Sequence, residues 1–190
     1  MTVIEQPKPF AHGPQIWPLS VPAYHALGEL DLVPERAELL YGEVYFKKPK
    51  PPQHSYLAGR LYDLLHAAVT ADCYVSPGQP ITGPDSEPEP DLAVIRGSFE
   101  DYAHAHPTTA ELVIEICVTT HDYDRSKLRA YATAGVKECW LVLGPEKQIE
   151  VHRQPQGGHF EGHSVHGPGG SLTSAVLPGF TVTLDSFFAA

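Results

Sequence analysis

Two acidic residues stand in apolar runs that predict β-strands, and together they could hold a metal ion. Glu115 lies in the middle of LVIEICV, a run typical of a strand buried on both faces. A buried carboxylate is costly unless a cation, a metal or hydrogen bonds compensate it. Asp91 opens a second apolar run, LAVI, directly after a proline. On neighbouring strands the two carboxylates could converge on one divalent cation, and magnesium prefers such oxygen ligands. Taken alone, each residue also fits a structural role, Glu115 at a cap or a sheet edge and Asp91 after a turn.

A lysine on a helix predicted further along the chain is the third residue of interest. Tyr123, Lys127 and Tyr131 are spaced by four, so they share one face of a helix. An amine on this aromatic face is unexpected, although its long apolar stem also allows it to extend past the tyrosines to water. Arg125 and Arg129 lie on another face of the same helix, where they could contact phosphates or simply be solvated.

The elements that must position these residues are short and separated by prolines and glycines. We expect helices over 20–30, 53–70 and 123–134, a hairpin over 36–48 that turns near Tyr41 and Gly42, and strands over 73–76, 79–82, 91–96, 112–118, 139–143 and 149–152. The helix over 53–70 would bury a stripe of Leu57, Leu61, Leu64, Leu65 and Ala68. Residues 154–171 predict a loose hairpin, and 177–188 a strand followed by a helical turn. Interleaved strands and helices of this kind predict an α/β or α+β protein with a mixed sheet.

Length and composition fit one globular domain. The chain has 190 residues, 42% of them hydrophobic, which excludes disorder as the main state. We expect a proline-rich arm over 1–19 and a single domain over 20–190. No apolar run approaches the ~18 residues of a membrane span. Glu5, Pro7 and Pro9 interrupt the start of the chain, where a signal peptide would be apolar, so we expect a cytoplasmic protein.

Charge and cysteine content indicate which partners and which redox compartment to expect. Thirteen Lys and Arg against 23 Asp and Glu give a net charge of −10, and such a chain as a whole repels the phosphates of a nucleic acid. Charge alone therefore disfavours a nucleic-acid partner. Cys73, Cys117 and Cys139 are widely spaced among apolar residues, which is typical of core thiols in a reducing compartment.

Histidine offers a competing interpretation of the chemistry. His159, His163 and His166 lie close together in the 152–166 segment. His159 and His163 have the spacing of a zinc pair on a helix, but the glycines around them argue against a helix. In a strand the two would share a face without converging, so we expect exposed surface histidines. His54, at the start of a predicted helix, could approach phosphate but is more typical of polar surface.

Several segments together resemble a known family. PEPDLAVI, ELVIEICVTT and YDRSKLRAYATAGVKECWLVL are similar to the Uma-two family of restriction endonucleases in the PD-(D/E)XK nuclease superfamily. The likeness extends to AELLYGEVYF, HSYLAGRLYDLL and LPGFTVTLDSFF, and covers roughly residues 20–188 in the family's order. The resemblance implies a restriction-endonuclease-like fold, with a mixed central sheet flanked by helices.

The resemblance also implies an active site. Asp91 matches the aspartate of the first motif, Glu115 the acidic residue of the second, and Lys127 a lysine that the family supplies from the following helix. In the commonest superfamily pattern this lysine lies two positions after the glutamate, where this chain has Cys117. Glu38 matches an early glutamate that belongs to the same acidic cluster.

On this resemblance, Asp91, Glu115 and the backbone carbonyl of Ile116 hold magnesium or manganese, and Lys127 orients water or stabilises charge on the phosphate. The implied function is a metal-dependent DNA endonuclease, and cutting both strands would call for a homodimer. The alternative is a non-catalytic module that keeps the fold and binds DNA or another partner. The three buried polar side chains favour the enzyme. The negative net charge of the chain favours the module. Glu89 adds to this charge at a position where relatives often carry an amide. A histidine-based metal-binding protein is a third and weaker hypothesis.

Overall fold

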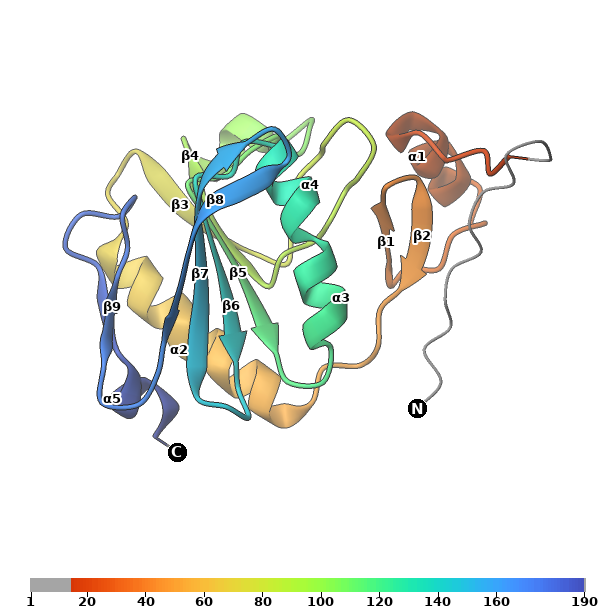
Figure 1. The fold of residues 1–190 in the computed structure, drawn as a ribbon. Helices are drawn as coiled ribbons and strands as arrows, with labels where there is room; N and C mark the ends of the chain where they lie inside the picture. Colours follow the sequence, from red (N-terminus) through yellow and green to blue (C-terminus); the bar gives the residue numbers. More distant parts are fainter. Residues whose placement is uncertain (1–14, 190) are drawn as a thin grey trace.

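The computed structural model describes residues 15–189, and a six-stranded mixed sheet forms its centre (Figure 1). The strands lie in the order β3 (Cys73–Pro77), β4 (Leu92–Arg96), β5 (Leu112–Cys117), β6 (Glu138–Leu143), β7 (Gln148–Gln156) and β8 (His159–His166). Neighbouring strands are antiparallel except β5 and β6, which are parallel. Parallel neighbours need a crossover connection, and α3 (His121–Ser126) and α4 (Leu128–Thr133) supply it.

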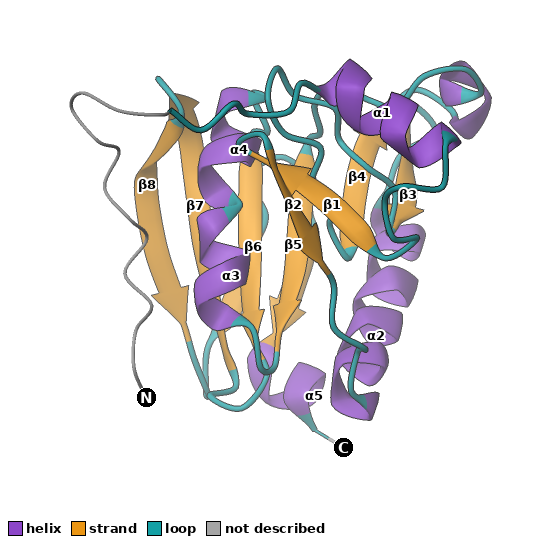
Figure 2. Ribbon diagram, turned by 90° about the vertical axis from the view of Figure 1, so that its right-hand side faces the viewer, coloured by secondary structure: helices purple, strands orange, loops and turns teal. Residues whose placement is uncertain are grey.

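Helices and small hairpins cover both faces of this sheet (Figures 1 and 2). One face carries α2 (Pro52–Ala68), α5 (Leu184–Phe188) and the ribbon of β9 (Ser171–Thr173) and β10 (Thr181–Thr183). The other face carries α3 and α4 beside the hairpin of β1 (Ala37–Leu40) and β2 (Glu43–Phe46). The helix α1 (Val21–Glu29) packs near this hairpin, and the 3₁₀ turn η1 (Phe99–Tyr102) follows β4. The predicted class, a mixed central sheet flanked by helices, is confirmed.

The strand β5 divides its side chains between two cores, because neighbouring residues of a strand point to opposite faces. Ile114 and Ile116 pack into the core beneath α2 and α5, whereas Val113 and Cys117 pack into the core beneath α4. Both sets are buried, which explains the continuous apolar run in the sequence. The alternation places Glu115 on the face that α3 and α4 cover.

The β1–β2 hairpin turns at Tyr41 and Gly42, as predicted. Both residues have positive φ, 56° and 79°, as in the two-residue turns that match the twist of paired strands. A Cβ at position 42 would lie 2.3 Å from the Cβ of Pro18, so the close approach of the preceding segment requires glycine. The N–H of Leu19 donates to the Gly42 carbonyl at 2.9 Å, which holds that segment against the turn.

The strand predicted over 79–82 does not form. The N–H groups of Ile81 and Thr82 donate to the carbonyls of Pro88 and Pro107, so the segment is tied to two loops instead of a strand ladder. Prolines recur at positions 80, 84, 88 and 90, and each removes an N–H that a ladder would use.

Two further expectations need correction. The helix predicted over 123–134 begins at His121 and divides at Lys127. There the Lys127 N–H donates to the carbonyl of Asp124, three residues back, at 3.2 Å, which tightens the helix locally. On α2, Leu64 was expected in the buried stripe but is 41% exposed, because the stripe runs through residues 54, 57, 61 and 65.

The remaining predictions concern the ends of the chain, the cysteines and membranes. The predicted arm over 1–19 falls largely on residues 1–14, which lie outside the described residues, as does residue 190. Cys73, Cys117 and Cys139 are free, and the latter two are buried, as expected of core thiols. Between residues 15 and 189, no helix has the length and apolar character needed to cross a membrane.

Candidate active site

Asp91 and Glu115 share a face of the sheet because of the way β4 and β5 pair. Ala93 of β4 lies opposite Val113 of β5, and both pack into the core beneath α4. Side chains two residues apart on a strand share a face, which places Asp91 and Glu115 beside each other on this side. The Oδ2 of Asp91 also accepts the N–H of Ile116 at 2.7 Å. This bond holds the aspartate against β5.

The β1–β2 hairpin brings a third carboxylate to the same face. Glu38 of β1 is fully buried. Its Oε2 accepts the N–H of Glu89 at 2.9 Å, and its Oε1 accepts the hydroxyl of Tyr123 at 2.7 Å. These bonds tie the hairpin to the segment before β4 and to α3, so Glu38 is fixed from two directions.

Lys127 supplies positive charge between two of these carboxylates. Its amine lies 2.9 Å from Oε1 of Glu38 and 3.2 Å from Oε1 of Glu115, and its side chain is only 4% exposed. The hydroxyl of Tyr131 donates to the same Glu115 oxygen at 2.5 Å. The ring centre of Tyr123 is 5.1 Å from the amine, within the range of a cation–π contact. The helix face predicted from the spacing of four therefore packs directly onto the carboxylates.

Asp91 has two basic partners of different exposure. The amine of Lys50 lies 2.7 Å from Oδ1, and its side chain is 51% exposed. The Nε2 of His54 lies 2.9 Å from Oδ2, and His54 is buried at the start of α2. The other ring nitrogen of His54 is buried with no hydrogen-bond partner within the described part of the chain. The histidine is thus a fixed partner of Asp91, whereas the lysine can turn away into solvent.

One cavity of about 600 Å³ is lined by most of these groups, including Lys50, His54 and Tyr123. The three carboxylates, Lys127 and Ile116 line its buried part, whereas the more exposed Lys47, Lys48 and Lys50 line its rim. Glu89 also lines the cavity but forms an ion pair with Lys47, so its charge is less available than the sequence suggested. The cavity therefore has an acidic floor, and its more exposed part carries these three lysines together with Glu89 and Asp122.

The two facing carboxylates differ in protonation. Burial raises the pKa of Glu115 to about 8, with Lys127 opposing the shift and Asp91 adding to it. Burial acts on Asp91 in the same direction, but the hydrogen bond and charge of His54, together with Lys50, lower its pKa to about 2. At neutral pH without a metal, the cavity therefore holds an ionised Asp91 and a largely protonated Glu115.

Comparison with known proteins gives the family. The sequence profile of Uma2, described as "Putative restriction endonuclease", matches residues 21–185. The chain belongs to the Uma2 family. Membership in this family supports a nuclease function, in agreement with the resemblance seen in the sequence motifs. No curated protein sequence matches this Uma2 chain.

A solved structure shares the fold of this Uma2 protein. It is described as a "putative nuclease belonging to DUF820" from Anabaena variabilis ATCC 29413, and it matches with a TM-score of 0.75 at 16% sequence identity. The match covers 90% of this chain and 98% of the other. At this level of identity the likeness shows the fold alone, and it confirms the predicted nuclease-like architecture.

The residues to which the Uma-two resemblance pointed all line the cavity: Glu38, Asp91, Glu115, Ile116 and Lys127. Their catalytic and metal-binding roles stay predictions. Cys117, which occupies the commonest lysine position, packs instead into the core beneath α4. Burial raises the pKa of its thiol, so it supplies no thiolate. Lys127 reaches the carboxylates from the helix, as the resemblance implied.

Sequence reasoning missed the partners of Asp91. Lys50 lies in a proline-rich segment with no periodicity, and His54 was expected on the polar surface. The available signal was the spacing of His54 from Leu57 and Leu61, which places it on the buried stripe of α2. A polar residue on such a stripe needs a buried partner, and Asp91 is that partner.

The arginines on the other face of α3 and α4 do not line the cavity. The Nη2 of Arg125 lies 2.5 Å from Oε1 of Glu150, and the guanidinium of Arg129 lies 3.8 Å from the ring centre of Tyr41. Both side chains are therefore engaged in contacts within the protein, and the open possibility of a phosphate contact finds no support in their positions.

Proposed function

We propose that this Uma2 protein is a metal-dependent endonuclease that hydrolyses the phosphodiester bonds of DNA. The observation that carries the proposal is the position of Lys127. Its amine lies within hydrogen-bonding distance of Glu38 and Glu115, in the cavity that Asp91 also lines. A module that only bound a partner would gain nothing from burying carboxylates and an amine together at the floor of an open cavity.

The donors in the cavity fit magnesium or manganese. We assign Asp91, Glu115 and the backbone carbonyl of Ile116 as the ligands, because these cations prefer oxygen donors. Asp91 is ionised at neutral pH, and the exposed Lys50 at its Oδ1 can move away. A bound cation would supply positive charge that neutralises the phosphate and would increase the acidity of the attacking water.

The protein's own side chains provide orientation. Lys127 donates hydrogen bonds from the floor of the cavity, where it would position water or stabilise negative charge that develops on the phosphate. Glu38 accepts a bond from this amine and another from Tyr123, so it holds the lysine in place. His54 holds Asp91 through its Oδ2.

Lysines at the cavity offer contacts to DNA phosphates despite the net charge of −10. Lys47, Lys48 and Lys50 line the rim of the cavity, where an approaching backbone would meet them first. Lysine contacts to phosphate position a duplex without reading its sequence. The acidic floor is compatible with this approach once a divalent cation inverts its local field.

Nicking of supercoiled plasmid tests the activity. We expect nicked and linear products with magnesium or manganese and none when EDTA is added. Asp91→Asn should remove the activity. His159→Ala, an exposed position on β8 outside the cavity, should leave it unchanged. Binding of DNA by the wild type without nicking in either metal would favour the non-catalytic module instead.

Calorimetry tests the metal ligands independently of turnover. Clustered carboxylates should bind magnesium weakly and manganese somewhat better, following the usual order for divalent ions. Asp91→Ala should abolish magnesium binding, whereas His163→Ala should not change it. The opposite result would replace the carboxylate site with a histidine site.

Cutting both strands of a duplex needs two active sites, so we also propose that the protein works as a homodimer. Sedimentation velocity on the purified chain, with and without a DNA duplex, would measure its mass. A single protomer bound to DNA that produces only nicks would contradict this part of the proposal.

A further inference from the structure

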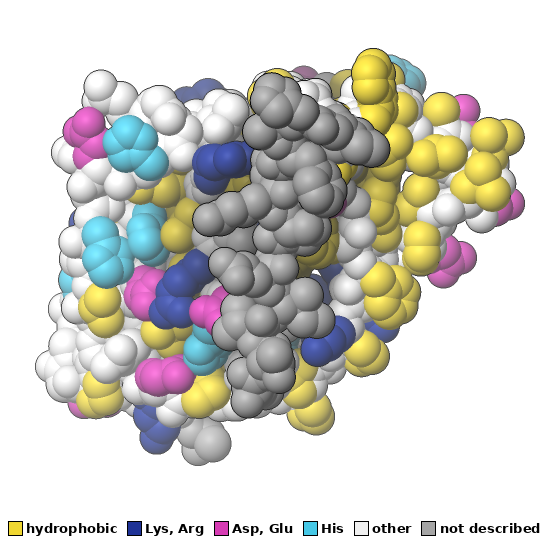
Figure 3. Space-filling model, turned by 45° about the vertical axis from the view of Figure 1, so that its right-hand side comes forward, with side chains coloured by type: hydrophobic (Ala, Val, Ile, Leu, Met, Phe, Trp, Pro, Cys, Tyr) yellow, Lys and Arg dark blue, Asp and Glu magenta, His cyan; other side chains and the backbone are white. Residues whose placement is uncertain are grey.

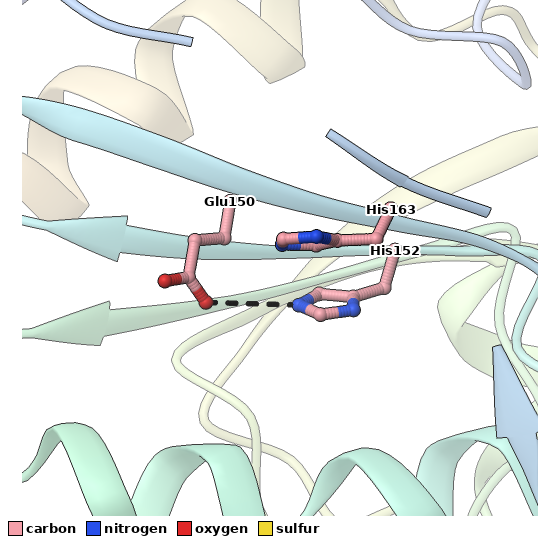
Figure 4. Close-up of side chains that lie close together, drawn as sticks. All are labelled: Glu150, His152 and His163. Carbon is pink, nitrogen blue, oxygen red and sulfur yellow. Dashed lines mark ion pairs between the residues drawn. The ribbon is translucent and has the colours of Figure 1, made fainter. Parts of the chain in front are cut away.

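A second group of potential metal ligands lies outside the cavity, on the β7–β8 hairpin. Glu150 and His152 are two residues apart on β7 and therefore share a face, and His163 of β8 stands opposite His152. Figure 4 shows the three side chains together, with the carboxylate directed at the ring of His152. One ligand atom from each residue lies within 4.8 Å of the other two.

We propose that Glu150, His152 and His163 form a second metal site, which takes zinc or a chemically similar divalent transition metal. Two imidazole nitrogens and one carboxylate oxygen suit zinc, copper or nickel better than magnesium. Three protein ligands with an open fourth position are a common zinc arrangement. The site therefore differs from the acidic cavity in both its place and its preferred ion.

The Nε2 of His152 gives the most direct support. This atom is buried, yet it has no hydrogen-bond partner among residues 15–189. The Oε2 of Glu150 lies 3.8 Å away, which is beyond hydrogen-bonding distance. Leaving a buried nitrogen unpaired costs free energy, and a metal ion between the two atoms would satisfy both.

Small side-chain rotations would complete the site. The donor atoms around a tetrahedral zinc lie about 3.3 Å apart, given bonds of about 2.0–2.1 Å. The rings of His152 and His163 already have their centres 4.8 Å apart. His163 is exposed on β8, the edge strand of the sheet, so its ring can turn toward the other ligands. Figure 3 shows histidine side chains gathered with acidic and basic ones on the left of the view.

Arg125 of α3 holds the carboxylate of this site in place. Its Nη2 lies 2.5 Å from Oε1 of Glu150, and its Nε lies 3.2 Å from Oε2. Carboxylates that bind metals commonly have such an outer partner. The guanidinium also offsets the charge of Glu150, so the imidazoles supply most of the affinity. We therefore expect zinc to bind in the micromolar range and not in the nanomolar range.

A metal at this position would connect β8 to β7 through side chains. An edge strand has unpaired backbone groups along one side, and β8 is held in the sheet by β7 alone among the strands. A ligand that binds only the folded chain raises its stability by mass action. Zinc should therefore raise the unfolding temperature through this hairpin.

Zinc titration of the full chain carrying Asp91→Asn tests the proposal, because that change disables the acidic cavity and isolates the second site. We expect one equivalent to bind, with changes in the imidazole nitrogen signals of His152 and His163 and a higher unfolding temperature. Adding His163→Ala removes a direct ligand, so it should weaken binding by more than the roughly 10- to 100-fold that loss of an outer partner costs, and it should remove the thermal shift. His159→Ala, exposed on the same strand, is the matched control and should bind zinc like the parent.

Two results would overturn the site. One is equal zinc affinity in the His163→Ala and His159→Ala variants. The other is a bound equivalent that leaves both imidazole signals unchanged. If His163→Ala did not fold, His163→Gln would serve in its place, since it keeps a polar side chain of similar length and removes the imidazole ligand. Unchanged zinc binding in that variant would contradict the proposal equally.

Discussion

Two glutamates are buried on neighbouring strands of the same sheet, and their surroundings differ sharply. Glu138 of β6 is fully buried. It accepts bonds from the Trp140 indole at 2.5 Å, from the Arg153 guanidinium at 3.1 Å and from the Ala175 N–H at 2.8 Å. These donors reach both carboxylate oxygens. Glu138 is thus a structural residue that joins β6, β7 and the segment after β9.

Glu115 of β5 is nearly as buried but has less compensation for its charge. The hydroxyl of Tyr131 and the amine of Lys127 both reach the same oxygen, Oε1. The lysine is shared with Glu38, and burial raises the pKa of Glu115 to about 8. Glu115 also lines the cavity, which Glu138 does not.

The comparison shows that burial of a carboxylate does not by itself mark a functional site. Hydrogen-bond donors satisfy both oxygens of the Glu138 carboxylate, so this residue can be buried and can contribute to the stability of the fold. Glu115 shares one cation with a second carboxylate and opens onto a cavity, so the site gains from an added cation. Glu115 therefore differs from Glu138 in two respects: the lysine that compensates its charge is shared with Glu38, and its side chain lines a cavity.

Loss of Lys127 should have the largest effect on activity. Lys127→Met keeps the apolar stem of the side chain and removes its charge. We expect nicking to fall by about 10²–10³-fold, because the amine acts where charge develops in the transition state. DNA binding in calcium should fall only modestly. Equal losses in both assays would show that the lysine is merely a phosphate contact.

Loss of Arg153 should lower stability and leave nicking unchanged, which is the reverse of what we expect for Lys127. Arg153→Met removes the charged partner of Glu138, and breaking a buried ion pair costs about 3–5 kcal/mol. Because the Arg153 side chain is 31% exposed, we expect the free energy of unfolding in urea to fall by about 2 kcal/mol. Nicking per folded molecule should not change. A loss of activity at full folding would show that the two glutamates are coupled.

The pH dependence of stability should distinguish the two glutamates. The pKa of Glu115 is raised from 4.5 to about 8, so between these values the folded protein holds a proton that the unfolded chain releases. This contribution is fully present below pH 4.5 and is lost as pH rises toward 8, on the order of 5 kcal/mol. The contribution of Asp91, whose pKa is lowered to about 2, is constant across the range from pH 5 to 8.

Urea unfolding of the metal-free protein between pH 5 and 8 measures this loss. Glu115→Gln cannot titrate and should flatten the decline. Glu138→Gln is the matched control, since it changes an equally buried glutamate on the next strand, and it should lower stability while keeping the decline. The same slope in the wild type and Glu115→Gln would show that Glu115 titrates normally.

The same comparison shows what the sequence could reveal. Glu115 was found because a charge interrupts an apolar run, whereas Glu138 stands at the first residue of its strand and gave no such signal. Lys127 was found from the spacing of four, which is a local property of a helix. Glu38 was identified only through the family resemblance, because its place beside the other carboxylates depends on how the hairpin packs.

Contacts between distant segments explain the misses. His54 and Asp91 are 37 residues apart, and no local pattern fixes how α2 lies over β4. The histidines of β8 were considered along one strand, yet the partner of His163 is His152 on the other arm of the hairpin. That pairing depends on register, which the turn at residues 157–158 sets. A change of one residue in the register would have moved His163 to the other face.

The smallest expected effect concerns Lys50, which contrasts with Arg153 as a carboxylate partner. Arg153 bonds to a buried Glu138 that the cavity does not reach, whereas the half-exposed Lys50 lies 2.7 Å from Asp91 Oδ1 at the cavity rim. A divalent cation that takes this oxygen must displace the lysine amine. Lys50→Ala should therefore raise magnesium affinity, by about two- to fivefold, since an exposed ion pair contributes about 0.2–1 kcal/mol. Calorimetry on Lys48→Ala, an exposed rim lysine two residues away, controls for the loss of one positive charge and should show a smaller gain. Weaker magnesium binding in Lys50→Ala would mean that the lysine positions Asp91 for the metal and does not compete with it.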